Sequence, residues 1–288
     1  MKSYKTQQRV SLSLRYVLLT VLALLWIFPI VWIVMASFTS NNVGFVADIF
    51  PHNFTFASYT GLFENKSGSF PFVNWFINTF LVALISATLS TLVTIVMAYV
   101  LSRLRFAFRK PFLQIALILG MFPGFMSMIA LYFILKSLNM LNLGGLVLVY
   151  VGGAGLGFYI AKGFFDTIPL SIDEAATIDG ATKWEIFKNI TLPLSRPIIV
   201  YTALMAFIAP WTDFIFSGII LGTDQAHPQN FTIAYGLYNM VHSQKGAATL
   251  YFTQFIAGCV IIAIPITLLF IFMQKFYVNG ITAGADKG

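Results

Sequence analysis

The sequence predicts an all-α membrane protein with six transmembrane helices and both termini in the cytoplasm. Of its 288 residues, 58% are hydrophobic and only 9% are charged, and the mean hydropathy is +0.84. A soluble domain carries roughly a quarter charged residues, so most of this chain must be surrounded by lipid or by other apolar helices. A membrane span needs about 20 apolar residues, and the chain holds six runs long enough.

Polar or mixed segments separate the apolar runs. The runs cover residues 16–38, 72–101, 112–135, 144–165, 197–221 and 251–276. Phe122-Pro-Gly124 predicts a kink in the third run, and Pro210-Trp-Thr-Asp213 interrupts the fifth. We therefore expect an N-terminal cytoplasmic segment (1–15), a transmembrane domain (16–276) and a cytoplasmic C-terminal tail (277–288).

The distribution of Lys and Arg orients these spans. If the N-terminus lies inside, four of the 17 basic residues precede the first run and four lie in the turn 102–110. Four more lie between residues 162 and 196, and two lie near the C-terminus. The positive-inside rule therefore places both termini, and the polar segment 166–196, in the cytoplasm.

Segment 166–196 separates the fourth run from the fifth and carries helix signals. Ser171-x-x-Glu174 and Thr182-x-x-Glu185 each fit a capping box, in which a hydroxyl and a carboxylate satisfy each other's backbone donors. Gly180 suits the residue that follows a helix C-cap. The segment therefore predicts two short helices joined at Asp179-Gly180.

The two predicted helices differ in their side chains. On the second, Trp184, Phe187 and Ile190 recur at i, i+3 and i+6 and form an apolar stripe. On the first, Ala175 and Ala176 leave a face on which another backbone can approach closely. Such a pair, tied at both ends to membrane spans, could pass a displacement from a partner into the membrane. A solvated connector whose stripe packs on the ends of the spans explains the residues equally well.

The residue order within this segment resembles a known motif. Glu174-Ala-Ala-x-x-Asp-Gly-Ala181, followed by Leu192-Pro-Leu194, is similar to the EAA loop of binding-protein-dependent ABC importer permeases. The resemblance implies the type I permease fold and a coupling loop at 166–196 that docks on an ATP-hydrolysing subunit. The docking positions that it implies are Glu174, Ala175, Ala176, Asp179, Gly180 and Ala181.

Two further stretches are similar to the MalG-like carbohydrate permeases of maltose and maltodextrin importers. These are Ala263-Ile-Pro-Ile-Thr267 and the tail from Val278 to Gly284. In that group the tail reaches the interface between two ATPase subunits. The resemblance assigns this role to Asn279, Gly280, Thr282 and Gly284.

An outer loop of MalG-like permeases enters the sugar site of the docked solute-binding protein. The matching positions here differ from the family in amino-acid sequence, and an ordinary surface loop explains them as well. They are His242, Ser243, Gln244, Lys245 and Gly246.

Asp213 is an acidic residue within an apolar run, beside Trp211. A charge at membrane depth is costly, so Asp213 should face a cavity or a partner. The pair could line a carbohydrate path, because sugars stack on aromatic faces and bond to carboxylates. Asp213 in a wet vestibule or at the cap of a broken helix is an equal alternative.

Catalysis by this chain is not expected. It has no Walker A pattern and no metal-ligand cluster, and its histidines (His52, His227 and His242) all fall in predicted outer loops. With the resemblance, this implies a non-enzymatic permease in a bacterial plasma membrane, without cofactor or metal, that carries maltose or maltodextrin.

The implied partners are a second, MalF-like permease subunit, two ATP-binding cassette subunits, an extracellular solute-binding protein and membrane lipid, but no nucleic acid. A different oligosaccharide or polyol is an alternative cargo. An alternative class is an ATP-independent secondary transporter, which should show more ionisable residues in its spans or inverted repeats. A membrane scaffold fits the kinked spans poorly.

Overall fold

The computed structural model describes residues 4–39, 50–51, 53–64, 70–153, 157–242 and 247–282. Within these residues, all regular elements are helices, and one isolated antiparallel bridge joins Thr39 to Phe54. The chain divides into two compact units. Unit 1 comprises residues 1–67 and 239–263, and unit 2 comprises residues 68–238 and 264–288.

Unit 1 contains the first long apolar helix. Helix α1 (Tyr4–Ala36) has 33 residues, and the chain that follows it folds back toward α2 (Ala57–Glu64). Ser37 Oγ lies 2.7 Å from the Tyr59 hydroxyl. The Phe38 ring contacts the Tyr59 ring with centroids 5.5 Å apart. A small aromatic cluster therefore joins the end of α1 to α2.

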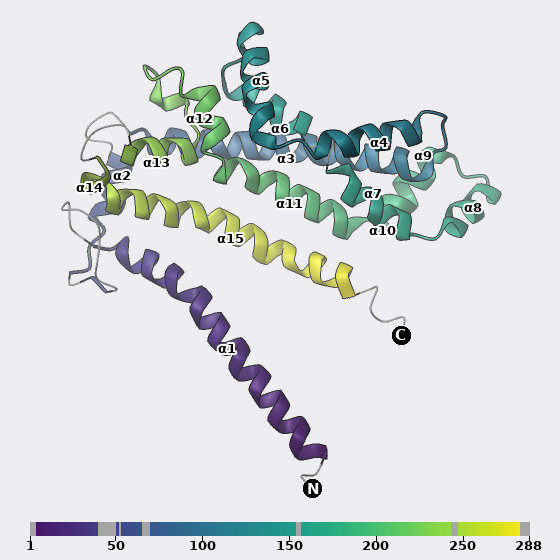
Figure 1. The fold of residues 1–288 in the computed structure, drawn as a ribbon, viewed down its shortest axis with the longest axis horizontal. Helices are drawn as coiled ribbons and strands as arrows, with labels where there is room; N and C mark the ends of the chain where they lie inside the picture. Colours follow the sequence, from purple (N-terminus) through teal and green to yellow (C-terminus); the bar gives the residue numbers. More distant parts are fainter. Residues whose placement is uncertain are drawn as a thin grey trace. The chain divides into compact units, whose positions relative to one another are not determined.

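Unit 2 is organised around α3 (Phe72–Arg103), against which α11 (Arg196–Thr212) packs along its length. The two helices lie side by side in Figure 1. Rings of Phe76 and Trp211, with centroids 5.2 Å apart, meet between them. Because α3 also packs against the helices of the fourth run, it is the central helix of this unit.

Two of the predicted interruptions are confirmed. Helix α4 (Arg109–Gly120) ends just before Phe122-Pro123, and α5 (Gly124–Ser137) leaves at an angle of 99°. Helix α11 ends at Thr212, and α12 (Ile215–Leu221) begins two residues later.

Within the described part of the chain, four helical stretches are long and apolar enough to cross a membrane. They are Val10–Ala36, Phe72–Arg103, Leu143–Thr167 and Phe252–Lys275. Two bent pairs raise the number to six if each pair is one span: α4 with α5, and Lys183–Leu194 with α11. The predicted all-α membrane fold is confirmed.

The third of these stretches consists of α6 (Leu143–Gly153) and α7 (Phe158–Thr167). The fourth belongs to α15 (Phe252–Thr282), which begins in unit 1 and ends in unit 2. The α15 helix continues past residue 276, where the sixth apolar run was expected to end.

The segment 222–250, one of the polar or mixed segments expected between apolar runs, is largely helical in its described residues. It contains the 3-10 turn η3 (Pro228–Asn230), α13 (Ile233–His242) and α14 (Ala247–Leu250). Ile233 and Leu237 are fully buried. Their spacing of four residues places both on one face of a helix, which explains why α13 forms where a loop was expected.

Candidate functional site

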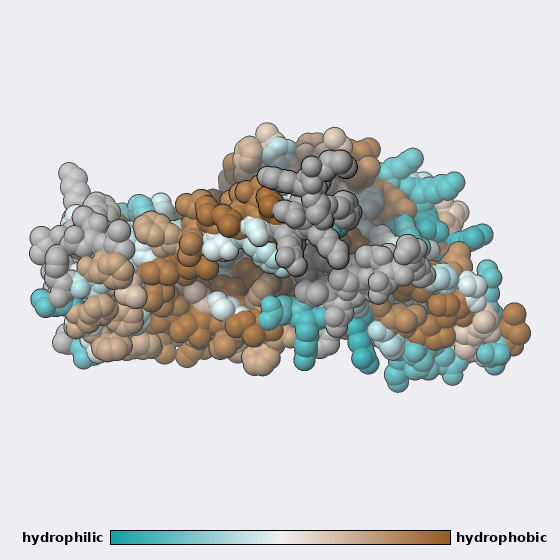
Figure 2. Space-filling model, turned by 90° about the horizontal axis from the view of Figure 1, so that it is seen from below, coloured by the Kyte–Doolittle hydropathy of each residue, from teal (hydrophilic) through white to brown (hydrophobic). Residues whose placement is uncertain are grey.

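Loop 166–196 consists of two helical arms. The first arm is α8 (Leu170–Ile178). The second arm runs through α9 (Lys183–Ile186), the π-helix η2 (Phe187–Thr191) and α10 (Leu192–Leu194). Figure 1 shows α8 projecting at one end of unit 2, and Figure 2 shows hydrophilic residues gathered at that end beside a largely apolar body. The predicted pair of short helices is confirmed.

Gly180 makes the turn between the arms. Its φ is +88°, a backbone conformation that glycine adopts without steric cost. The Ala181 amide donates to the Ala176 carbonyl at 2.9 Å, and the Gly180 amide donates to the Thr177 carbonyl at 3.1 Å. These two bonds form a Schellman motif, so the prediction of a helix end at Gly180 is confirmed.

Thr182 caps the second arm as predicted. Its backbone N–H donates to Glu185 Oε2 at 2.7 Å, and its Oγ1 accepts from the Glu185 amide at 3.3 Å. Both halves of the capping box are therefore present. The bonds from the Thr182 backbone and side chain hold the pKa of the Glu185 carboxyl below its ordinary value.

The prediction that Ser171 caps the first arm is wrong. Helix α8 begins at Leu170, so Ser171 is already its second residue, and Pro169 occupies the cap position. Proline is tolerated at a helix start because the first amide groups have no partner within the helix. Asp173 in the first turn supplies the negative charge that a helix N-terminus favours.

The second arm is fixed to the membrane helices. Ile186 and Phe187 are buried, and the Phe187 ring contacts the Tyr99 ring of α3 with centroids 4.6 Å apart. The Tyr99 hydroxyl donates to the Lys183 carbonyl at 3.1 Å. The predicted apolar stripe therefore packs on the spans through Phe187, whereas Trp184 is 66% exposed.

The second arm also contains a π-helical turn, which ends two residues before Pro193. There the Leu192 amide donates to the Phe187 carbonyl, five residues back. Proline has no N–H, and its ring clashes with the carbonyl four residues earlier, so a wider turn accommodates it. The π turn thus lets the arm stay helical up to Pro193.

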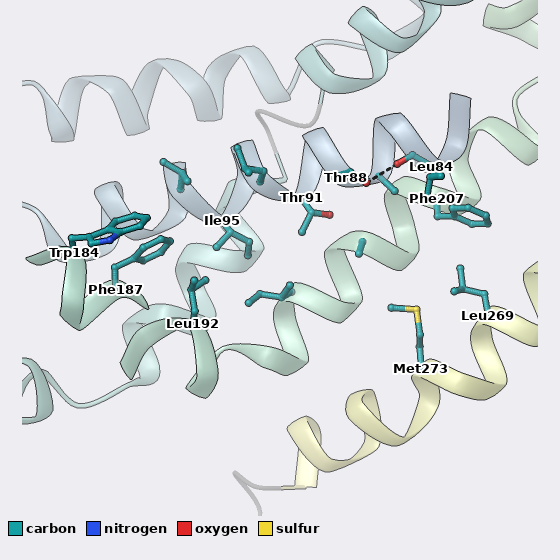
Figure 3. A pocket seen from close by; sticks show the side chains of 15 residues that line it. Leu84, Thr88, Thr91, Ile95, Trp184, Phe187, Leu192, Phe207, Leu269 and Met273 are labelled. Carbon is teal, nitrogen blue, oxygen red and sulfur yellow. Dashed lines mark hydrogen bonds between the residues drawn. The ribbon is translucent and has the colours of Figure 1, made fainter. Parts of the chain in front are cut away.

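A cavity of about 760 Å³ is lined by this arm together with α3, α11 and α15. Figure 3 shows Trp184, Phe187 and Leu192 at one end of it, with Phe207 of α11 and Met273 of α15 farther along. Nearly all of its lining side chains are apolar. The second arm is therefore held at α3 but borders open space toward α11 and α15.

The structure brings the six predicted docking positions together on α8 and the turn after it. None of the α8 residues is buried, and Ile178 is 86% exposed. The docking positions are all exposed or half-buried: Glu174, Ala175, Ala176, Asp179, Gly180 and Ala181. This arm presents a helix face with small side chains and two carboxylates to its surroundings.

The other predicted contact positions are only partly within the described residues. His242 ends α13 and is exposed, while residues 243–246, which hold Ser243, Gln244, Lys245 and Gly246, lie outside them. The backbone at Asn279, Gly280 and Thr282 belongs to the last turns of α15, and Gly284 lies outside the described residues.

Asp213 sits at the break between α11 and α12. Its Oδ1 accepts from the Phe216 amide at 2.9 Å, as a helix cap does. Its Oδ2 accepts from the Tyr150 hydroxyl of α6 at 2.7 Å. Trp211 is only 2% exposed. The carboxylate thus ties together two interrupted spans.

Tyr150 also borders a second cavity of about 250 Å³, between α3, α6, α7 and α11. Its lining residues include Ser90, Thr94 and Thr202, which carry hydroxyl groups. Tyr150 therefore joins Asp213 to a partly polar recess, while Trp211 of α11 packs against Phe76 of α3.

Residues 90–282, which include all of loop 166–196, match the family described as "Binding-protein-dependent transport system inner membrane component". The chain belongs to this family. It is a transport component of a bacterial inner membrane rather than an enzyme, and the predicted location and resemblance are confirmed.

Members of the family are similar to the chain over nearly its whole length. It is 38% identical to the galactooligosaccharides transport system permease protein GanQ of Bacillus subtilis over 99% of this chain and 98% of that protein. It is 36% identical to the maltodextrin transport system permease protein MalD of Streptococcus pneumoniae over 99% of both.

A solved structure shares the fold. A bacterial ABC transporter involved in the import of alginate superimposes with a TM-score of 0.73, covering 96% of this chain and 100% of that chain. At 22% identity this likeness concerns the fold alone, and the predicted importer permease fold is confirmed.

Proposed function

We propose that the chain is a permease subunit of an ABC importer for maltose or maltodextrin, forming half of the translocation pathway. In this proposal α8 and the Gly180 turn dock on an ATP-hydrolysing subunit. The observation that carries it is the first arm of loop 166–196, which has no buried residue and is joined to a second arm anchored by the buried Ile186 and Phe187. Family membership favours this function over an ATP-independent transporter.

Helix α8 exposes apolar and small side chains that a partner could cover. A nine-residue helix without buried side chains is too short to be stable alone in water. A partner that covers Ile178 and approaches Ala175 closely would give α8 the apolar contacts that it lacks. The second arm, which is fixed to α3, would keep α8 joined to the spans when a partner moves it.

The partners of the proposal are a second, MalF-like permease, two ATP-binding cassette subunits and an extracellular solute-binding protein. Segment 242–246 would contact the binding protein, and the backbone from Asn279 to Gly284 would reach the ATPase interface. The sugar would pass a hydrated path, to which Asp213 and Tyr150 contribute polar groups next to the 250 Å³ cavity.

Gly180→Trp tests the docking proposal. The change forces a bulky residue into a left-handed backbone conformation and places an indole at the docking surface. We expect co-purification of the ATPase subunits to fall at least tenfold, and sugar uptake with it. Gly163→Trp is the control, because Gly163 is exposed on α7 and an added Cβ would meet no described atom within 4 Å apart from its chain neighbours and its own helix backbone. Full retention of the ATPase subunits and full uptake with Gly180→Trp would refute the docking role.

The maltodextrin cargo is supported by the names of several relatives, MalD among them. The 38% identity to GanQ favours a galactooligosaccharide as a second candidate. Uptake of labelled maltotriose by the reconstituted importer, in competition with unlabelled galactooligosaccharide, separates the two. The maltodextrin proposal fails if maltotriose is not carried and galactooligosaccharide is.

A further inference from the structure

The last turn of α3 holds the base of the first arm. Arg103 Nη2 donates to the carbonyls of Phe165 and Ile168, each at 2.9 Å. These carbonyls lie at the end of α7, where helix carbonyls lack partners within their own helix. The Arg103 Nε also lies 3.5 Å from Asp173 Oδ2 in the first turn of α8, and the Arg103 side chain is only 4% exposed.

One turn earlier, α3 holds the second arm. The Tyr99 hydroxyl donates to the Lys183 carbonyl, and the Tyr99 ring contacts the Phe187 ring at an interplanar angle of 49°. Tyr99 and Arg103 are four residues apart and therefore lie on one face of α3. A single helix end thus contacts the chain on both sides of the proposed docking surface.

The opposite end of α3 is hydrogen-bonded to segment 228–233, here called the outer segment. Trp75 Nε1 donates to the Pro228 carbonyl at 2.7 Å, and Thr79 Oγ1 accepts from the Ile233 amide at 2.7 Å. Helix α3 has 32 residues, which at 1.5 Å per residue span about 48 Å. It therefore links loop 166–196 directly to the segment that leads into α13.

We propose that Arg103 is a positioning residue that transmits the displacement of α8 to α3, and through α3 to the outer segment at 228–233. This inference rests on the proposed docking of α8. The planar guanidinium presents several donors in a fixed arrangement, so Arg103 holds the end of α7 and Asp173 at once. When a partner moves α8, the end of α3 must move with it.

The test uses the assembled importer, because transmission needs the ATPase subunits in place. Amide hydrogen exchange of segment 228–233 is compared between the nucleotide-free complex and the complex trapped with ADP and vanadate. We expect a nucleotide-dependent difference in the parent complex. In Arg103→Gln this difference should shrink at least fivefold, while the ATPase subunits still co-purify, because the exposed face of α8 is unchanged.

Two further variants make the result decisive. Asp173→Asn keeps the bonds from Arg103 to α7 but removes the ion pair, so the exchange difference should shrink about twofold. This variant decides the matter if Arg103→Gln does not fold. Arg105→Gln, in the exposed turn after α3, is the matched control and should behave as the parent.

Each outcome separates the inference from the docking proposal. An unchanged exchange difference in Arg103→Gln, or in Asp173→Asn when the first variant does not fold, overturns the inference, as does a parent complex without any difference. Loss of the ATPase subunits from Arg103→Gln also overturns it, since Arg103 would then only maintain the loop. Failure of the parent chain to retain ATPase subunits refutes the docking proposal itself.

Discussion

The two arms of loop 166–196 are neighbours of similar length, yet only the second arm contains buried residues. In the first arm no residue is buried, whereas Ile186, Phe187 and Thr191 of the second are each less than 9% exposed. The difference follows from the aromatic contact between Phe187 and α3, for which α8 has no counterpart. A loop that transmits motion needs both properties: one surface free for a partner and a base fixed to the spans.

The largest expected difference between the arms appears when one apolar side chain is removed from each. Phe187→Ala should lower the free energy of unfolding by about 3–5 kcal/mol, because it leaves a cavity against Tyr99. Ile178→Ala, at a site that is 86% exposed, should change it by less than about 0.5 kcal/mol. Denaturation of the purified chain in detergent measures both, and equal destabilisation would show that the arms do not differ.

Ile178→Ala should instead weaken partner binding. Titration of the ATPase subunits onto the reconstituted permease is expected to show reduced affinity for Ile178→Ala and unchanged affinity for the conservative Ile178→Leu. Unchanged affinity in both would remove Ile178 from the docking surface.

A smaller effect is expected at the turn between the arms. Gly180→Ala places a Cβ in the left-handed region and should cost about 1–2 kcal/mol. Gly163→Ala, in helix α7, should stabilise by up to about 1 kcal/mol, because alanine is the better helix former. Thermal unfolding of the two variants should therefore shift in opposite directions, and shifts of the same sign would contradict this account of the turn.

The smallest effects compare the two predicted caps. Thr182→Ala removes a capping bond and should cost about 1 kcal/mol. Ser171→Ala removes none and should stay within about 0.5 kcal/mol of the parent. A larger loss in Ser171→Ala than in Thr182→Ala, measured by the same unfolding experiment, would reverse the assignment of the caps.

What the sequence could predict was governed by local chemistry. The spans follow from apolar runs, the sharp bend follows from Phe122-Pro-Gly124, and the Gly180 turn follows from the conformational freedom of glycine. The cap predicted at Ser171 was wrong because a capping pattern does not take account of the neighbouring Pro169. The cap position falls on Pro169, and the helix begins at Leu170.

Contacts between distant residues left no such pattern. Arg103 stood out only as part of a basic turn, and its bonds to Phe165, Ile168 and Asp173 arise when α3 and α7 pack together. Tyr99 likewise reads as one aromatic residue among many in an apolar run. Their roles depend on the fold as a whole, so only the structure could place them.

In the proposed function, the first arm docks on the ATPase subunits while the second stays attached to α3. Thiol labelling of single-cysteine variants in inside-out vesicles tests this difference between the arms most directly. In a Cys259→Ser background, Ala175→Cys reports on the first arm, and Leu194→Cys, at a residue that is 47% exposed, reports on the second. Adding the ATPase subunits should reduce labelling of Ala175→Cys at least fivefold and that of Leu194→Cys less than twofold. Equal labelling of Ala175→Cys with and without the ATPase subunits would contradict the account.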